Sequence, residues 1–326
     1  MTAQATTPTS EPDLTVQLGP LALAHPLLNA SGTYDVLETA AHYEGDAVAT
    51  FPFAAYVPKT VTLEPRIGNP PPRVTETPSG VINSVGLANP GLAHFLDGLP
   101  LLARLPVPLI VSVGGAQPAD YVTVVRRIEE TVDAAPAGAL PPVSAYELNV
   151  SCPNVTTGLA VGTDAVATAA LVAALRQVTK RFLIVKLTPN VTDISAIARA
   201  AVTAGADAVS LVNTFKGLVL EAQTLRPFLG GKTGGVSGPA IKPLALRLVA
   251  EVATAVNVPI IGMGGIASGH DVLEFIACGA TAVAIGTANF AGLGTAVRIL
   301  GELRDEMRAR GLTALAEVRG AALVGE

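Results

Sequence analysis

The stretch "FLIVKLTPNVTDISAIARAAVTAGADAVSLVNT" (residues 182–214) contains one complete strand–helix–strand unit. Its first apolar run, 182–188, predicts a buried strand, and the alanine-rich segment 193–204 predicts a helix that ends in the turn "AGAD". A second apolar run, 208–214, follows the turn. Two buried runs joined by a helix are typical of parallel strands with a crossover helix, so the stretch predicts an α/β fold.

The same alternation extends along the 326 residues of the chain. Eight strands alternating with helices predict a closed (β/α)8 TIM barrel, although the pattern alone also allows a doubly wound open sheet. The other predicted strands are 26–31, 54–60, 108–114, 145–151, 259–265 and 282–287. The other predicted helices are 118–134, 164–180, 241–255, 269–278 and 291–311.

Residues 61–91 interrupt the alternation because they are rich in proline, glycine and asparagine. A loop of this length within a compact domain is often functional, and here it predicts a long loop or hairpin inserted at the barrel rim. No linker divides the rest of the chain. We therefore expect a disordered tail at 1–12 and a single domain at 13–326.

Composition argues against several classes of partner. The net charge of −5 comes without a run of basic residues, which argues against nucleic acid and anionic membranes. No apolar stretch reaches the roughly 18 residues that span a bilayer. The two cysteines, Cys152 and Cys278, are too few for a disulfide framework or a four-thiolate cluster, so we expect no metal and a cytoplasmic location.

Polar residues or glycines stand at the carboxyl end of each predicted strand. In a parallel barrel these ends meet at one rim, where barrel active sites lie. Lys59 and Lys186 interrupt very apolar runs, and a buried ammonium is costly unless an anion or dipole faces it. The rim residues are Ser31, Lys59, Thr60, Ser112, Asn149, Lys186, Asn213, Thr214, Gly264, Gly265, Gly286 and Thr287.

Glycine-rich turns indicate what the rim binds. "GMGG" (262–265) and "IGT" (285–287) follow the last two predicted strands, where many barrels bind phosphate through backbone N–H groups. "GGVSGP" (234–239) is a third glycine-rich turn before a helix. Residues 262–267 also fit the dinucleotide pattern G-x-G-x-x-A, but no acid ends the next strand to hold a ribose. The turns therefore predict one phosphate of a mononucleotide.

Cys152 lies between Asn149 and Asn154 in "ELNVSCPN" (147–154), at the end of a predicted strand. A thiol there could act as a nucleophile or as a base, and proton abstraction fits better because no histidine lies nearby in the sequence. Cys278 is expected to be a small buried hydrophobe. Amides suit the edges of a flat heterocycle, although each alone could cap a turn. The candidate amides are Asn83, Asn149, Asn154 and Asn213.

Several motifs together resemble the class 1 dihydroorotate dehydrogenases over about residues 13–311. They are "NASGTY", "PKTVTLEPRIGNPPPR", "NSVGLANPG", "ELNVSCPN", "VKLTPN", "VNT", "GGVSGPAIKP", "GMGGI" and "IGTANF". "TGGVSGPAIKP" and "GTANF" are most similar to the NAD-linked class 1B. The resemblance implies an FMN-dependent barrel that oxidises dihydroorotate to orotate in de novo pyrimidine biosynthesis.

The resemblance also implies roles for individual residues. Cys152 would remove the C5 proton while hydride leaves C6 for flavin N5, and Lys186 would stabilise the anionic reduced flavin. Ser112 falls where similar proteins often have asparagine. Implied substrate contacts are Lys59, Asn83, Ser84, Val85, Gly86, Leu87, Asn149, Asn154, Asn213 and Thr214. Implied FMN contacts are Ser31, Lys59, Thr60, Ser112, Asn149, Lys186, Val212, Gly238, Gly264, Gly265, Gly286 and Thr287.

NAD-linked members of the family pass electrons to a second subunit that carries FAD and a [2Fe–2S] cluster. The resemblance therefore implies such a partner and a dimer of the catalytic chain. Fumarate, a quinone or oxygen is the alternative acceptor. The alternative functions are a flavin enzyme acting on another pyrimidine such as dihydrouracil, a non-redox phosphate-binding barrel, and a catalytically silent subunit.

Overall fold

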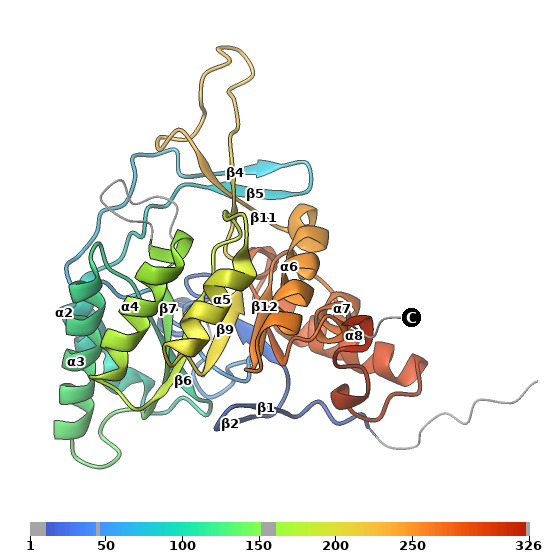
Figure 1. The fold of residues 1–326 in the computed structure, drawn as a ribbon, viewed down its shortest axis with the longest axis horizontal. Helices are drawn as coiled ribbons and strands as arrows, with labels where there is room; N and C mark the ends of the chain where they lie inside the picture. The colour runs from blue at the N-terminus through green and yellow to red at the C-terminus, as the bar shows by residue number, and fades with distance from the viewer. Residues whose placement is uncertain (1–10, 44–45, 151–160, 324–326) are drawn as a thin grey trace, which may run out of the picture.

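The computed structural model describes residues 11–43, 46–150 and 161–323. Its centre is a curled sheet of seven strands in which every pairing is parallel (Figure 1). In spatial order the strands are β3 (Leu27–Asn29), β13 (Ala282–Ile285), β12 (Ile260–Met263), β9 (Ala208–Leu211), β8 (Phe182–Lys186), β7 (Val143–Asn149) and β6 (Leu109–Val113). Each was predicted from its apolar run.

Segment 54–61 fills the eighth position and closes the barrel. The Ala54 N–H donates to the Leu27 carbonyl of β3 at 2.9 Å. On the other side, Tyr56 and Val61 form isolated parallel bridges with β6. The predicted regular strand at 54–60 is wrong in this respect, because pairing is limited to bridges in a segment where Pro58 has no N–H to donate. The predicted closed (β/α)8 barrel is confirmed.

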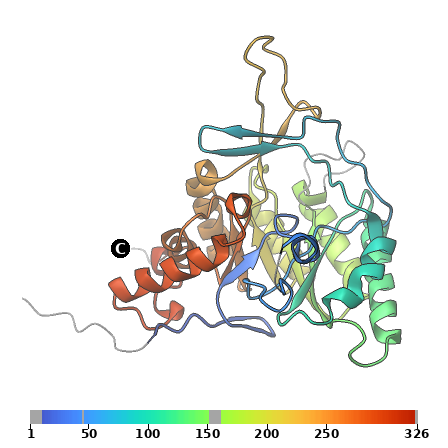
Figure 2. The same ribbon diagram turned by 180° about the vertical axis from the view of Figure 1, so that it is seen from behind.

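Helices cover the outside of the barrel (Figures 1 and 2). Asp164, Asp193 and Ser268 cap three of them by accepting a backbone N–H from the first turn, as expected for short polar side chains. No helix in the described ranges has both the length and the apolar character needed to cross a membrane. The helices are α1 (Val36–His42), α2 (Gly91–Gly98), α3 (Pro118–Ala134), α4 (Ala165–Arg176), α5 (Ile194–Thr203), α6 (Lys242–Ala255), α7 (Gly269–Ala277) and α8 (Thr295–Ala309). Short 3₁₀ turns are η1 (Leu99–Leu102), η2 (Val161–Thr163), η3 (Pro239–Ile241), η4 (Thr287–Ala291), η5 (Leu315–Glu317) and η6 (Ala321–Leu323).

Alternation along the strands separates two apolar cores. On β7, Tyr146 and Leu148 belong to the core between the sheet and the helices, whereas Ala145 belongs to the core inside the barrel. The antiparallel hairpin of β1 (Val16–Leu18) and β2 (Leu21–Leu23), which the sequence did not predict, adds its leucines to the inner core beside Phe182. The hairpin therefore plugs the amino-terminal end of the barrel and leaves the other end for the site.

A four-stranded antiparallel sheet, here called the mouth sheet, lies over the carboxyl ends of the barrel strands (Figures 1 and 2). It contains the hairpin predicted within 61–91. "GGVSGP", however, was predicted as a turn, and its first four residues form a strand. Glycine is required there because a Cβ on Gly235 would lie 1.9 Å from Thr214 Oγ1. In order the strands are β10 (Phe215–Gly217), β11 (Gly234–Ser237), β5 (Gly80–Asn83) and β4 (Val74–Thr77).

Candidate active site

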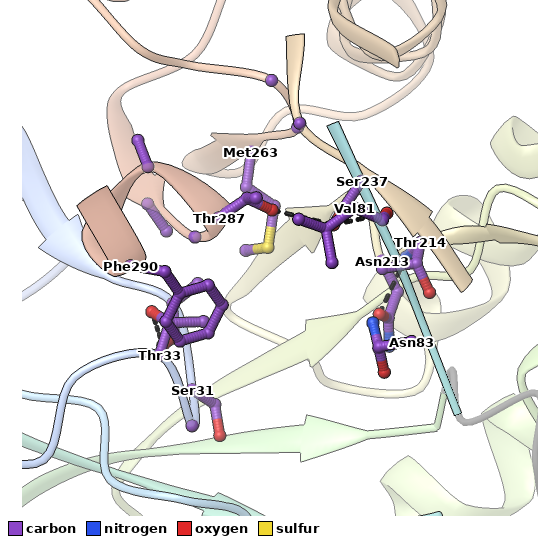
Figure 3. Close-up of a pocket in the computed structure, with 18 of the residues that line it drawn as sticks. Ser31, Thr33, Val81, Asn83, Asn213, Thr214, Ser237, Met263, Thr287 and Phe290 are labelled. Carbon is purple, nitrogen blue, oxygen red and sulfur yellow. Dashed lines mark hydrogen bonds between the residues drawn. The ribbon is translucent and has the colours of Figure 1, made fainter. Parts of the chain in front are cut away.

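A cavity of about 470 Å³ lies between the mouth sheet and the carboxyl ends of the barrel strands (Figure 3). This is the end of a barrel where active sites form, and the volume is within the usual range for small-molecule sites. Asn83 and Ser237 enter its wall from the mouth sheet, while Ser31 and Thr287 enter from the barrel. Segments more than 200 residues apart in the chain therefore share one wall.

Most of the predicted site residues described by the structure line this cavity. Cys152 and Asn154 lie outside the described residues, and Ser84 and Ser112 do not reach the wall. Being placed together does not by itself assign a role, so the predicted contacts remain predictions. The predicted residues on the wall are Ser31, Lys59, Thr60, Asn83, Val85, Gly86, Leu87, Asn149, Lys186, Val212, Asn213, Thr214, Gly238, Gly264, Gly265, Gly286 and Thr287.

Ser84 and Ser112 lie behind the wall and support it. Both are fully buried. The Ser84 hydroxyl oxygen accepts a hydrogen bond from Asn69 Nδ2 at 2.9 Å. This bond joins the residue that follows β5 to the loop that precedes β4. The Ser112 hydroxyl lies 3.0 Å from that of Thr60. Ser112 therefore contacts a residue of the cavity wall, Thr60, whereas the partner of Ser84, Asn69, does not line the cavity.

The hydroxyl of Thr60 joins three polar side chains. Asn149 Nδ2 donates to it at 3.0 Å, and the hydroxyls of Ser31 and Ser112 lie 3.2 and 3.0 Å away. Ser31 also donates to the Pro58 carbonyl at 2.8 Å. A buried network with satisfied partners fixes its members, so this one fixes the orientation of the Asn149 amide at the wall.

A buried pair of opposite charges lies below the network. Lys186 Nζ is 3.9 Å from Glu147 Oε1, and both side chains are less than a tenth exposed. Ser210 donates to Glu147 Oε2 at 2.8 Å. Glu147 was missed among the candidates, although an acid inside the apolar run of a predicted strand is a detectable signal. The pair explains how a lysine can be buried inside the barrel.

Glycines shape the opposite end of the cavity. Gly264 and Gly265 have φ values of +129° and +79°, which side chains rarely adopt. A Cβ on Gly265 would lie 2.8 Å from the Gly238 carbonyl oxygen. At Gly286, in contrast, the nearest atom to a Cβ would be the Ala30 methyl at 3.8 Å, so the wall offers open space beside the backbone. Backbone N–H groups that no side chain covers, beside open space, can bind an anionic group.

The cavity also has lining residues that the sequence did not indicate. Thr287 Oγ1 donates to Ser237 Oγ at 2.8 Å, and Ser237 Oγ donates to the Val81 carbonyl at 3.3 Å, linking the barrel to the mouth sheet (Figure 3). Arg298 donates to the Ala267 carbonyl at 3.0 Å. Ser237 was visible in "GGVSGP" but was read only as part of a turn. The missed residues are Thr33, Val74, Val81, Ser237, Met263, Ala267, Phe290 and Arg298, among others.

Fold and site together define a class: a closed (β/α)8 barrel enzyme with a rim cavity lined by a buried lysine, asparagine amides and glycine turns. The family model described as dihydroorotate dehydrogenase matches residues 13–307. The chain belongs to the dihydroorotate dehydrogenase family. It is therefore an oxidoreductase of pyrimidine biosynthesis, and its reaction is the oxidation of dihydroorotate.

Curated relatives agree with this assignment over nearly their whole length. The relative from Desulforudis audaxviator is 47% identical over 309 residues, covering 94% of this chain and 96% of its own. Those from Pelobacter propionicus and Bacillus pumilus are 46% and 44% identical, covering 86% and 94% of this chain and 88% and 96% of their own. All three are named dihydroorotate dehydrogenase B (NAD(+)), catalytic subunit. The predicted resemblance to the NAD-linked class is confirmed.

Proposed function

We propose that this chain is an FMN-dependent catalytic subunit that oxidises dihydroorotate to orotate and delivers the electrons to NAD⁺ through a partner subunit. One observation carries the proposal: a single cavity collects a buried lysine, Lys186, an anchored amide, Asn149, and the glycine turn 264–265. A cation, a fixed amide and bare backbone are suitable contacts for a flat redox cofactor with one phosphate.

The residues present fit FMN. The cavity is large enough for a mononucleotide, and Val212 and Met263 give part of its wall an apolar surface for a ring. Lys186 would supply a cation for the ring, and backbone N–H groups of the glycines and Thr287 would hold the phosphate. When bound, the flavin supplies the two-electron acceptor for the hydride that leaves C6 of the substrate. The fit therefore favours FMN over a non-redox phosphate ligand.

Substrate is proposed to bind on the side of the cavity formed by Lys59, Asn83, Asn213 and Thr214, with Asn154 added from outside the described residues. An ammonium pairs with the carboxylate of dihydroorotate, and amides match the donors and acceptors of its imide edge. Leu87 and Val85 cover the same region with apolar atoms. This combination favours a pyrimidine that carries a carboxylate over one that lacks it.

Cys152 is proposed as the base that removes the C5 proton. It follows β7, whose last residue, Asn149, lies on the cavity wall. A thiolate is a competent base, and its fraction rises with pH toward the ordinary thiol pKa of about 8.5. Cys278 does not share this role, because it ends α7, away from the cavity wall, and burial raises the pKa of its thiol.

The proposed partner carries FAD and a [2Fe–2S] cluster and acts on a dimer of this chain. Two cysteines in the whole sequence cannot supply the four ligands of such a cluster, so an iron–sulfur step requires another chain. The term "catalytic subunit" in the names of the relatives also describes one component of a larger enzyme.

The test begins with the purified chain and its visible flavin absorbance. The flavin released on denaturation should co-migrate with FMN, and anaerobic dihydroorotate should bleach the band whereas dihydrouracil should not. Cys152→Ala should keep the flavin and lose the bleaching. A colourless protein, or equal bleaching by both compounds, would contradict the proposed cofactor or substrate.

A second experiment addresses the acceptor. The chain is purified from its native source with and without co-purifying subunits, and NADH formation from dihydroorotate is followed. We expect NADH only when a subunit containing FAD and iron accompanies the chain. NADH formation by the chain alone, or fumarate-dependent turnover without the partner, would contradict the proposed route.

A further inference from the structure

Glu147 is an acid inside the barrel that the proposed chemistry does not yet use. It lies on β7 opposite Ser112 of β6 and Ile184 of β8. Strand alternation places it on the inward side with Ala145 below and Asn149 above. Its side chain is 4% exposed and does not line the cavity, so it cannot serve simply as a solvated surface charge.

The hydrogen bonds of Glu147 are asymmetric. Oε2 accepts from Ser210 at 2.8 Å. Oε1 is buried, has no hydrogen-bond partner among the described residues, and lies 3.9 Å from Lys186 Nζ. A buried carboxylate oxygen without a donor is costly. Ser210 therefore fixes one oxygen, and the other is left with Lys186 as its oppositely charged neighbour.

Lys186 faces the cavity while Glu147 stands behind it. The ion pair between these two side chains is the charge contact that the described structure gives Lys186. Lys59 is a second cation on the same wall and would repel rather than stabilise the ammonium of Lys186. Removing one member of a buried pair leaves the other charge uncompensated, which is strongly unfavourable.

We propose that Glu147 is a positioning residue that, anchored by Ser210, keeps the ammonium of Lys186 directed at the cofactor side of the cavity. The inference rests on the proposed function, since it concerns the cation that FMN meets. Lys186 stabilises negative charge on the reduced cofactor only while its ammonium lies at the wall. Glu147 thereby sets the reduction potential of the bound flavin without touching it.

The sign of the effect follows from the positions of the two charges. Loss of the carboxylate alone would favour the reduced anion by removing a negative charge. Movement of the Lys186 ammonium away from the wall would disfavour it. Lys186 lines the cavity and Glu147 does not, so the change at Lys186 is closer to the flavin and dominates.

The experiment measures the midpoint potential of the flavin by anaerobic dye equilibration in the holoenzyme, together with FMN affinity of the apoprotein. Glu147→Gln should weaken binding of reduced relative to oxidised FMN about tenfold, which lowers a two-electron potential by about 30 mV. Glu129→Gln is the matched control, because it removes the acid of a partly buried pair with Arg181, whose guanidinium contacts Val143 at the opposite end of β7.

A second background keeps the inference testable if Glu147→Gln alone folds poorly. The double variant Lys186→Met with Glu147→Gln removes both charges, and such replacements of a buried pair are commonly tolerated. Its potential should be no lower than that of Lys186→Met alone, because only the direct effect of removing the negative charge of Glu147 remains. An unchanged or higher potential in Glu147→Gln, or an equal shift in both backgrounds, would overturn the inference. A purified chain without FMN would instead refute the proposed function.

Discussion

The side chain of Asn29 forms two hydrogen bonds with the backbone of Val57 and so joins the first strand of the barrel to the segment that closes it. Asn29 Nδ2 donates to the Val57 carbonyl at 2.7 Å, and the Val57 N–H donates to Asn29 Oδ1 at 2.9 Å. Asn29 is fully buried. A side-chain amide here replaces the backbone pairing that a regular strand would have supplied.

Asn29→Ala should therefore lower the free energy of unfolding by about 2–4 kcal/mol, because a buried N–H and a buried carbonyl lose their partners together. Urea unfolding followed by circular dichroism measures the loss. Asn257→Ala, at an exposed position before β12, is the control and should change stability by less than about 0.5 kcal/mol. Equal stability of the two variants would contradict the role of Asn29 in closure.

His25 gives the fold a pH dependence. Burial and the nearby charge of Arg304 lower the pKa of His25 from 6.5 to about 4. The unfolded chain therefore binds a proton at a higher pH than the folded chain does. This contribution to stability is fully present above about pH 6.5 and is lost as the pH falls toward 4, with an upper limit of about 3 kcal/mol.

The measurement is the free energy of unfolding between pH 4 and 7.5 for the original chain and for His25→Gln. The variant should show a smaller decrease over this interval, since it has no imidazole to protonate. His94→Gln removes an exposed histidine and should leave the decrease as it was. Identical pH profiles for the original chain and His25→Gln would refute the prediction.

The sequence predicted those parts of the molecule in which one local pattern dominates. Buried strands such as β8 and β12 are apolar runs. Helix α3 has the same bounds, 118–134, as the helix predicted from the sequence. Segment 54–61 reads as a strand because it is apolar, yet its pairing depends on the Asn29 side chain, which no local pattern reveals. Strand β11 of the mouth sheet escaped prediction because Gly234 and Gly235 have low strand propensity and are fixed by contacts with distant residues.

The site was predictable where a polar side chain ends an apolar run, as with Lys186 and Asn213. It was less predictable where a residue contacts a wall residue without lining the cavity itself. Ser112 meets the rule for a strand-end residue but contacts Thr60, and Glu147 violates the apolar run without reaching the wall. Distinguishing these cases requires side-chain directions across neighbouring strands, which depend on the register of the barrel.

The hydrogen bond between Thr287 and Ser237 should couple the barrel to the mouth sheet. Thr287→Val and Ser237→Ala each remove one hydroxyl of the pair, and the double variant completes a thermodynamic cycle for apoprotein stability and FMN affinity. We expect a coupling energy of about 0.5–1.5 kcal/mol in stability. Thr123→Val, which removes a hydroxyl bonded within α3, should show no coupling with Ser237→Ala. If the effects of Thr287→Val and Ser237→Ala on stability are strictly additive, the hydrogen bond does not couple the barrel to the mouth sheet.

Gly286→Ala tests the glycine end of the cavity. A Cβ at this position would meet the Ala30 methyl at 3.8 Å and otherwise enter the open space at the wall, so it would occupy volume that the proposed phosphate needs. We expect FMN affinity to fall at least about tenfold, equivalent to about 1.4 kcal/mol. Fluorescence titration of the apoprotein with FMN gives the affinity, and circular dichroism shows whether the fold is kept. Gly301→Ala in α8, where a Cβ meets no atom within 4 Å, is the matched substitution and should leave FMN affinity unchanged. If Gly286→Ala binds FMN as tightly as Gly301→Ala does, the phosphate does not lie beside Gly286.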